Sequence, residues 1–425
     1  MEVLVALLAV PTISAAWEMS PAHFPPEIQP PDENGLVGHL KPFGHQRPPE
    51  GPVIEYDTVL HPRDFWDKHV SKKLPCVFRG AVKESGAYKL WTDEYLSENY
   101  GDNLVLYEKR SEDRQKSAKQ MPLKDFIKEY KSEESNIYAV TLTPEDMRKD
   151  VQVLSCLLCG TFYEFLQESN FWMGYGGTRS VIHYDADNIM HCLVAGGRKD
   201  WMLVAHEDKD KLNMAGGGQF QGSGFSLLDS DKVDMEMYPE VANVPWLWTT
   251  LQPGDCVFVP DAHLHQVRSY GRVISATVLF TPFPYFNDTG CDKATFGYTD
   301  LSQVYLHWTY KKGDKVIDMG YMNPEQLRAN LRTILNDEKV VTQEKFNDIV
   351  LAGAEIDVSP PYLFTLLDTH GRGYLTEDDI NTMSHDLLKQ FARAIDPPHG
   401  EYEDEEEETE DDSMNVTGHD DHDEL

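Results

Sequence analysis

Residues 176–185 read GGTRSVIHYD, and further along the chain residues 260–267 read PDAHLHQV. If the first segment is a β-strand, His183 and Asp185 point to the same face, because side chains alternate along a strand. A later strand that carries His265 completes a set of two histidines and one carboxylate. Such a set holds Fe(II) on one side and leaves coordination positions open for a co-substrate and oxygen. These three residues are therefore the candidate catalytic and metal-binding residues.

The segments around these residues predict a small antiparallel barrel. A mostly apolar run at residues 188–194, a glycine-containing turn and a second run at residues 199–204 predict a hairpin. The hairpin would place Lys199 on the strand next to the one that bears the metal ligands. There its ammonium can pair with a carboxylate of a small acid. Before the final histidine, the turn at residues 251–255 leads into a predicted strand at residues 256–259.

These motifs resemble those of the JmjC/cupin-type 2-oxoglutarate and Fe(II)-dependent oxygenases, and among them the hydroxylase-like branch. The resemblance covers roughly residues 55–286, and its most specific parts are GTxSxxHYD, GxKDW and GDxxFVPxxxxHxV. It implies that the two histidines and the aspartate bind Fe(II). It also implies that three residues hold the distal carboxylate of 2-oxoglutarate: Lys199, Ser180 and, as a weaker candidate, Asn188.

The last metal ligand is the point at which the chain departs from this family. Where the family usually has a bulky aromatic pair before the final histidine, this chain has His263-Leu264. Two histidines therefore lie on one face of the predicted strand. We assign the ligand to His265, because its distance from Pro260 matches the family pattern, and we expect His263 around the ligands or at the rim.

The expected fold is α+β. It consists of a double-stranded β-helix, a jelly-roll/JmjC cupin barrel, followed by a small all-α, EF-hand-like domain. Helices are expected at residues 61–70, 92–100 and 122–131, outside the barrel. Five parts are expected along the chain: a signal peptide (1–16), a proline-rich linker (17–52), the oxygenase domain (53–290), the helical domain (320–397) and an acidic disordered tail (398–425).

The two ends of the chain indicate a compartment. Residues 1–16 have an apolar core and end in small residues, as a secretory signal peptide does, although Glu2 replaces the usual basic start. The last four residues, HDEL, are a retention signal that a KDEL-type receptor reads. The sequence therefore predicts the lumen of the endoplasmic reticulum. No other stretch approaches the ~20 apolar residues of a membrane span, so none is expected.

The charge of the chain limits its partners. Asp and Glu number 72 and Lys and Arg 38, which gives a net charge of −34. A chain this acidic repels nucleic acid, so a role on DNA or histones is disfavoured. Part of the excess lies in residues 401–412, which are nearly all acidic and are expected to be disordered.

The oxidising lumen affects how the cysteines and sequons are interpreted. Cys156 and Cys159 have the spacing of a redox motif, but without a thioredoxin-like pattern nearby we expect a structural disulfide or two buried thiols. Cys192 and Cys256 lie in predicted core strands and are expected to be small apolar fillers. The sequons NDT at residues 287–289 and NVT at residues 415–417 are usable acceptors of N-linked glycans in that compartment.

Residues 368–379, DTHGRGYLTEDD, resemble an EF-hand loop. Asp368 and Asp379 are the calcium candidates at its first and last positions. However, His370 and Arg372 stand where oxygen ligands belong, and Asp379 is shorter than the usual bidentate glutamate. We therefore favour a degenerate loop that is kept for packing over a functional Ca²⁺ site.

By the resemblance, the chain is a 2-oxoglutarate-dependent dioxygenase that hydroxylates a side chain of a luminal or secreted protein. The rival hypothesis is a non-catalytic calcium-binding or chaperone-like protein with a degenerate oxygenase domain. The acidic tail and the EF-hand-like loop support it, whereas the simultaneous presence of all three ligands and Lys199 counts against it. A third hypothesis is a cupin that binds manganese or zinc without 2-oxoglutarate.

Overall fold

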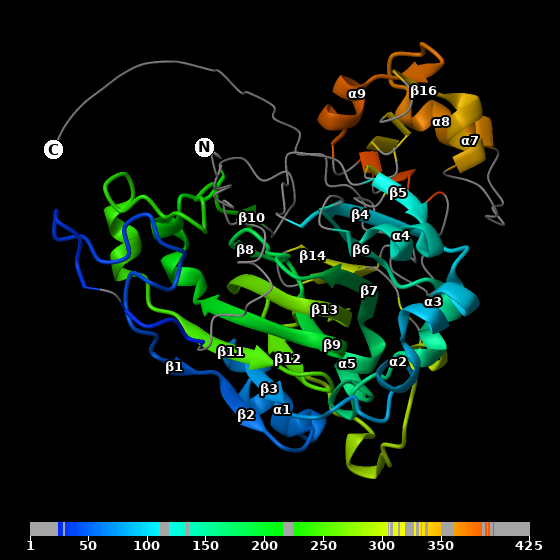
Figure 1. Ribbon diagram of the computed structural model, residues 1–425. Coiled ribbons are helices and arrows are strands. Elements are labelled where there is room, and N and C mark those ends of the chain that lie inside the picture. Colours follow the sequence, from blue (N-terminus) through cyan, green and yellow to red (C-terminus); the bar gives the residue numbers. More distant parts are fainter. Residues whose placement is uncertain are drawn as a thin grey trace, which may run out of the picture.

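A computed structural model of the chain describes residues 24–28, 30–110, 119–132, 136–215 and 224–304 and, with gaps, parts of 306–394. The expected signal peptide, the acidic tail and the second sequon lie outside the described residues. The described part consists of a large β-structure and a small unit that contains the last helices (Figure 1). Among the helices of the described part, none has the length and apolar character that a membrane crossing requires.

Thirteen strands of the described part form one sheet, in the order β2-β3-β12-β9-β13-β7-β6-β4-β5, with β1, β8, β10 and β11 joined beside this path. Most neighbours are antiparallel, but β1 with β11 and β2 with β3 are parallel. A large mixed sheet of this kind fits the expected jelly roll. The strand bounds are Gly51–Pro52 (β1), Ile54–Tyr56 (β2), Cys76–Phe78 (β3), Leu104–Lys109 (β4), Lys119–Pro122 (β5), Ile137–Leu142 (β6), Leu166–Tyr175 (β7), His183–Tyr184 (β8), Asn188–Val204 (β9), Gly224–Phe225 (β10), Leu247–Leu251 (β11), Cys256–Val259 (β12) and Leu264–Phe280 (β13).

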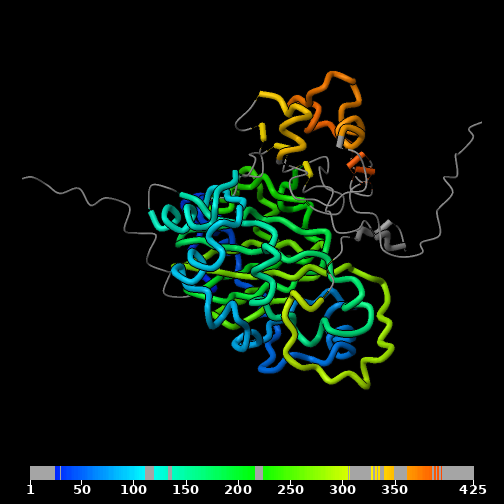
Figure 2. The backbone as a smooth tube through the Cα atoms, turned by 90° about the vertical axis from the view of Figure 1, so that its right-hand side faces the viewer, coloured from blue at the N-terminus to red at the C-terminus, as the bar shows by residue number. Residues whose placement is uncertain are grey.

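The two longest strands, β9 and β13, are the centre of the barrel. They pair antiparallel from one end to the other, with Asn188 opposite Phe280 and Val204 opposite Leu264. On its other edge, β9 pairs with β12 in its first half and with β11 in its second half. In Figure 2, which is turned by 90°, the layers of the large β-structure lie below the small unit that contains the last helices.

The predicted hairpin at residues 188–204 is wrong, because these residues form the single strand β9. Its glycines bend the strand without reversing it. Gly196 has a φ of +84°, and a Cβ placed there would lie 1.8 Å from the carbonyl oxygen of Arg272. The pairing register shifts opposite this point, between Tyr270 and Val273. The backbones therefore approach so closely that only glycine fits.

The structure has helices close to the three ranges expected at residues 61–70, 92–100 and 122–131: α1 (Pro62–Lys68), α3 (Asp93–Tyr100) and α4 (Leu123–Glu129). Two further short helices, α2 (Gly86–Leu90) and α5 (Gly160–Glu164), were not expected. The helix α3 begins where a cap is available, since the Thr92 side chain accepts a hydrogen bond from Tyr95 N. Phe65 of α1 and Phe126 of α4 are fully buried in the main core. These helices stabilise the barrel through apolar packing.

Residues 30–52, part of the expected linker, pack against the barrel. Phe43 is 2% exposed and belongs to a core cluster with Met202 and Trp246. The backbone N–H of Leu40 donates to the carbonyl of Val233 at 2.8 Å. This segment is therefore held against the part of the barrel that contains Met202, Val233 and Trp246.

The cysteines differ from expectation. Cys192 and Cys256 were expected as apolar fillers, but they face each other across β9 and β12 and form a disulfide. Cys159 bonds to Cys291, far along the chain, while Cys156 is a buried free thiol. The two cysteines of the CxxC pattern therefore neither pair with each other nor both remain thiols. Sequence spacing did not reveal these partners, because tertiary packing brings them together.

The last described unit has a core of its own. Its elements are β16 (Val341–Thr342), α7 (Gln343–Ile349), α8 (Pro360–Leu367), β17 (Tyr374–Leu375) and α9 (Glu377–Thr382), and a hairpin of β14 (Thr309–Lys312) and β15 (Lys315–Asp318) precedes it. Leu327, Leu331 and Ile334 are buried in this core, as their helical spacing predicted. The unit is not purely helical, because β16 and β17 form an antiparallel pair.

Candidate metal centre

Two histidines meet because their strands are in register. His183 of β8 is the direct partner of His265 of β13, and their ring centroids are 4.2 Å apart. Asp185 follows β8, and its Oδ2 lies 3.9 Å from His183 Nε2 and 3.6 Å from His265 Nε2. One potential ligand atom of each residue lies within 4.8 Å of the other two. The structure thus brings together the three residues that were predicted to form the metal site.

Hydrogen bonds orient both imidazole rings. Nδ1 of His183 lies 2.9 Å from the carbonyl oxygen of Val181, and Nδ1 of His265 lies 3.1 Å from that of His263. A carbonyl oxygen can only accept, so each Nδ1 carries the hydrogen and each Nε2 presents its lone pair. Metal-binding histidines commonly show this arrangement, in which the second nitrogen donates to a carbonyl. The donor set therefore fits a divalent transition metal.

His263 does not belong to this group of ligand atoms. Its side chain is buried, and this burial lowers its pKa to about 4. Its contribution to the site is the backbone carbonyl that orients His265. Of the two histidines that the sequence placed on one face, the geometry thus favours His265 as the ligand.

A cavity of about 250 Å³ adjoins the three residues. Its wall includes His183, Asp185 and His265 and also contains Lys199 and Ser180. This volume accommodates a small organic acid beside a metal ion. The cavity therefore combines a metal-type donor set with a buried cation.

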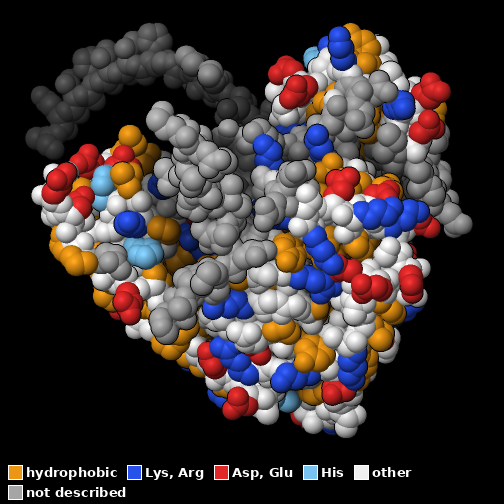
Figure 3. All heavy atoms as spheres, in the orientation of Figure 1, with side chains coloured by type: hydrophobic (Ala, Val, Ile, Leu, Met, Phe, Trp, Pro, Cys, Tyr) orange, Lys and Arg blue, Asp and Glu red, His pale blue; other side chains and the backbone are white. Residues whose placement is uncertain are grey.

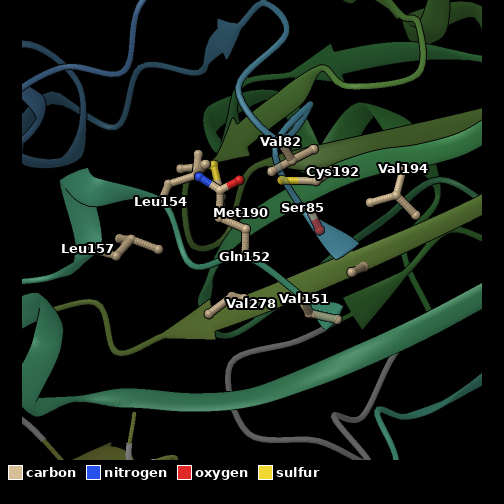
Figure 4. A pocket seen from close by; sticks show the side chains of 11 residues that line it. Val82, Ser85, Val151, Gln152, Leu154, Leu157, Met190, Cys192, Val194 and Val278 are labelled. Carbon is tan, nitrogen blue, oxygen red and sulfur yellow. The ribbon is translucent and has the colours of Figure 1, made fainter. Parts of the chain in front are cut away.

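A second cavity is of a different kind. Its volume is about 10 Å³, which is space for about one water molecule. Figure 4 shows that its wall is apolar apart from Ser85 and Gln152, with the sulfur of Cys192 beside them. It is too small to hold an organic ligand.

The amine of Lys199 is buried in the interior of the protein. The residue is 6% exposed, and burial lowers the pKa of its amine to about 7. Its Nζ lies 3.0 Å from His191 Nε2 and 5.7 Å from the centroid of the Trp172 ring. No carboxylate of the described residues forms an ion pair with it. A buried ammonium without a counter-charge is unfavourable, so the site favours an anionic ligand.

The other two residues expected at the carboxylate differ in their placement. Ser180 lies in the cavity wall, where its Oγ accepts a hydrogen bond from Val267 N at 2.9 Å. Asn188 is not among the residues of this wall. Its Oδ1 instead accepts a hydrogen bond from Asp261 N at 3.1 Å, which fixes the loop that precedes the last histidines. The structure therefore gives Asn188 a supporting place in the loop instead of the expected place at the ligand.

His191, Trp172 and Thr277, which were not singled out from the sequence, lie in the cavity wall near Lys199. His191 stands eight positions before Lys199, and an even spacing on one strand puts both side chains on the same face. The even spacing could therefore have identified His191. It was overlooked because the predicted hairpin assigned the two residues to different strands.

The calcium candidates have protein partners. Asp368 Oδ2 accepts a hydrogen bond from Gly373 N at 2.6 Å. Asp379 accepts hydrogen bonds from the backbone and hydroxyl of Thr376 and forms an ion pair with Arg372. The guanidinium of Arg372 thus lies against the carboxylate that would close a calcium loop. Calcium binding by Asp379 would require this ion pair to open.

The charged side chains of the exterior are mixed. On the face in Figure 3, acidic and basic side chains lie interspersed over the described residues.

Comparison with known proteins places this geometry in a family. Residues 62–285, more than half of the chain, match the family model described as a cupin-like domain. JmjC domain-containing protein F of Dictyostelium discoideum is 25% identical over 280 residues, which cover 51% of this chain and 59% of that protein. Lysine-specific demethylase 8 of Xenopus tropicalis is 22% identical over 233 residues, 51% of this chain and 52% of that protein.

A third relative, tRNA wybutosine-synthesizing protein 5 of Danio rerio, is 25% identical over 255 residues, which cover 54% of this chain and 74% of that protein. The chain thus spans only about half the length of the first two relatives. The residues that match the family model include the metal-type residues and the buried lysine. The chain belongs to the cupin-like domain family, and its relatives support a JmjC oxygenase type of cupin.

Proposed function

We propose that this protein is an Fe(II)- and 2-oxoglutarate-dependent oxygenase that hydroxylates a side chain of a protein substrate. One observation carries the proposal: the converging donors of His183, Asp185 and His265 share a cavity with the uncompensated cation of Lys199. A metal alone would not require a buried ammonium. An anionic co-substrate that reaches from the metal to Lys199 accounts for both features.

The residues of the cavity would have different roles. His183, Asp185 and His265 would hold Fe(II), with both imidazoles fixed in the tautomer that presents Nε2. With dioxygen as the oxidant, the chemistry that Fe(II) and 2-oxoglutarate would supply is oxidative decarboxylation to succinate and carbon dioxide, in which one oxygen atom of O2 enters succinate and the other hydroxylates a C–H bond. The cavity wall limits the access of water to the reacting groups.

Lys199 would bind the distal carboxylate of 2-oxoglutarate. Its ammonium donates up to three hydrogen bonds, and only one is directed at His191. A hydrogen bond between two charged groups is stronger than one between neutral groups, and burial strengthens it further. Ser180 lies in the same wall as a second polar group.

The substrate is argued from this chain, because the relatives' names refer to different molecules, a lysine-specific demethylase and a tRNA-modifying protein. We propose a luminal or secreted protein as substrate and the endoplasmic reticulum as location. The disulfides Cys159–Cys291 and Cys192–Cys256 support an oxidising compartment, as does the terminal HDEL. In the lumen, the KDEL-type receptor would be a second partner.

Calorimetry tests the proposal. Wild type, Asp185→Ala and Lys199→Ala are titrated anaerobically first with Fe(II) or Mn(II) and then with 2-oxoglutarate. We expect Asp185→Ala to lose metal binding, because it removes one of three ligands. Lys199→Ala should keep the metal but weaken 2-oxoglutarate by about 1.5–3 kcal/mol, the range for a hydrogen bond to a charged group.

A matched control separates the cavity from a general effect of losing a lysine. Lys209 also contacts a histidine, with its Nζ 3.1 Å from His206 Nε2, but it is not part of the cavity wall. Lys209→Ala should bind metal and 2-oxoglutarate as the wild type does. Equal binding by wild type, Asp185→Ala and Lys199→Ala would contradict the proposal.

The rival functions predict other results in the same titrations. A non-catalytic calcium-binding or chaperone-like protein would bind no 2-oxoglutarate, and the contacts of Arg372 with Asp379 count against a calcium loop. A cupin with manganese or zinc would bind metal at the three ligands without any dependence on Lys199. Dependence of 2-oxoglutarate binding on Lys199 therefore separates the oxygenase from both rivals, and loss of metal binding in Asp185→Ala separates the two rivals from each other.

A further inference from the structure

Four side chains form a continuous chain of contacts at the Lys199 end of the cavity. Trp172 Nε1 donates to Thr277 Oγ1 at 2.8 Å, and Thr277 Oγ1 lies 2.8 Å from His191 Nδ1. His191 Nε2 then lies 3.0 Å from Lys199 Nζ. The chain crosses β7, β13 and β9, and all four residues belong to the cavity wall.

The hydrogen atoms in this chain can be assigned when Lys199 is an ammonium. An ammonium only donates, so His191 Nε2 accepts and the ring hydrogen is on Nδ1. That hydrogen is donated to Thr277 Oγ1, which already accepts from Trp172. The hydroxyl oxygen of Thr277 thus accepts twice, and its own hydrogen is left to donate elsewhere. Since Thr277 lies in the wall, the cavity is the available direction.

The imidazole of His191 is buried and fixed in position, so it can orient Lys199 and Thr277. It is 4% exposed, and its burial together with the nearby Lys199 charge keeps the pKa of the ring well below its usual value. The ring therefore stays neutral and acts as an acceptor for Lys199. It also packs edge-on against Trp201, with centroids 5.0 Å apart, and Trp201 in turn stacks on His265.

We propose that His191 is a positioning residue for the carboxylate ligand, which it serves by holding the ammonium of Lys199 and, through Thr277, directing a second donor into the cavity. The proposal rests on the proposed binding of 2-oxoglutarate and adds the group that organises it. The ligand carboxylate then meets two donors that are fixed before it arrives. Such preorganisation increases affinity, because less freedom is lost on binding.

Two substitutions of His191 test the role. In His191→Phe the ring shape is kept, but Lys199 loses its acceptor and Thr277 its donor. We expect 2-oxoglutarate to bind about tenfold more weakly or worse, with Mn(II) binding unchanged. In His191→Gln the amide can accept from Lys199 and donate to Thr277, so most of the affinity should return.

The measurements are anaerobic calorimetry with Mn(II) and 2-oxoglutarate on the full chain, together with thermal unfolding of each variant. Lys209→Ala is the control for a Lys–His contact outside the cavity wall. A purely structural role would lower stability and metal binding alike, without recovery in His191→Gln, and that result overturns the proposal. Unchanged affinity in His191→Phe also overturns it and leaves the proposed function intact. Absence of 2-oxoglutarate binding in the wild type overturns both.

Discussion

Lys199 shows how a single side chain links the barrel to its proposed ligand. Burial lowers the pKa of its amine to about 7, so near neutral pH the residue is present in both charged and neutral forms. An anion bound beside the amine stabilises the charged form and raises this pKa. Ligand binding and proton binding at Lys199 are therefore coupled.

We predict that binding of 2-oxoglutarate takes up a proton at about pH 8 and much less at about pH 6. At the higher pH most Lys199 amines are neutral before binding, and at the lower pH most are already charged. Calorimetry in buffers with different ionisation enthalpies gives the number of protons taken up. Proton release, or uptake of the same size at both pH values, would show that Lys199 is not the group that titrates.

Some residues of the site could be predicted, and others could not, for physical reasons. The alternation of side chains along a strand predicts that His183 and Asp185 face one side, and the structure brings both to His265. The direction of the Asn188 side chain depends on the loop at Asp261, which no local pattern reveals. Pairing of Cys192 with Cys256 likewise depends on which strands become neighbours.

At the scale of elements, the continuity of β9 places Lys199 and His191 on one face of one strand. Gly196 and Gly197 lie opposite the register shift of β13, and a Cβ on either would lie 1.8 Å from a carbonyl oxygen. A glycine pair between two apolar runs is typical of a turn, which is why the sequence predicted a hairpin. The structure shows one continuous strand, because β13 pairs with β9 on both sides of the two glycines.

Replacing Gly196 by alanine should destabilise the fold by on the order of 2–3 kcal/mol or more, since the new methyl group meets the backbone of Arg272. Gly290→Ala is a matched control. Gly290 has a φ of +85°, close to the +84° of Gly196, but no atom lies within 4 Å of its Cβ position. The control should lose only about 1–2 kcal/mol from the left-handed backbone. Urea unfolding measures both, and equal losses would mean that the close approach is unimportant.

The whole molecule combines a barrel with a C-terminal unit that has a separate apolar core. The family motifs predicted the barrel, because its ligands and turns have fixed spacings along the chain. The helical spacing of Leu327 and Leu331 predicted part of the second core. The strand pair of β16 and β17 was not predicted, because two-residue strands carry no periodicity.

The proposed luminal location has a consequence at the surface of the barrel domain. Asn287 is exposed, and its Oδ1 accepts hydrogen bonds from Thr289 N at 3.0 Å and Thr289 Oγ1 at 2.6 Å. Its backbone is anchored, since the N–H donates to Thr161 Oγ1 at 2.8 Å. Asn287 is not part of the cavity wall, so a glycan there would leave the site accessible.

We therefore predict an N-linked glycan on Asn287 when the full chain is made in eukaryotic cells. Endoglycosidase H should increase the electrophoretic mobility of the wild type, because a retained luminal protein keeps its early, high-mannose glycans. Asn287→Gln should reduce this shift by the contribution of one glycan, whereas Thr289→Ser preserves both the sequon and the hydroxyl and should keep the full shift. Asn415→Gln reports separately on the second sequon. A wild type that the enzyme leaves unchanged, or a shift that disappears only in Asn415→Gln, would contradict a glycan at Asn287, and the first of these results would also count against the luminal location.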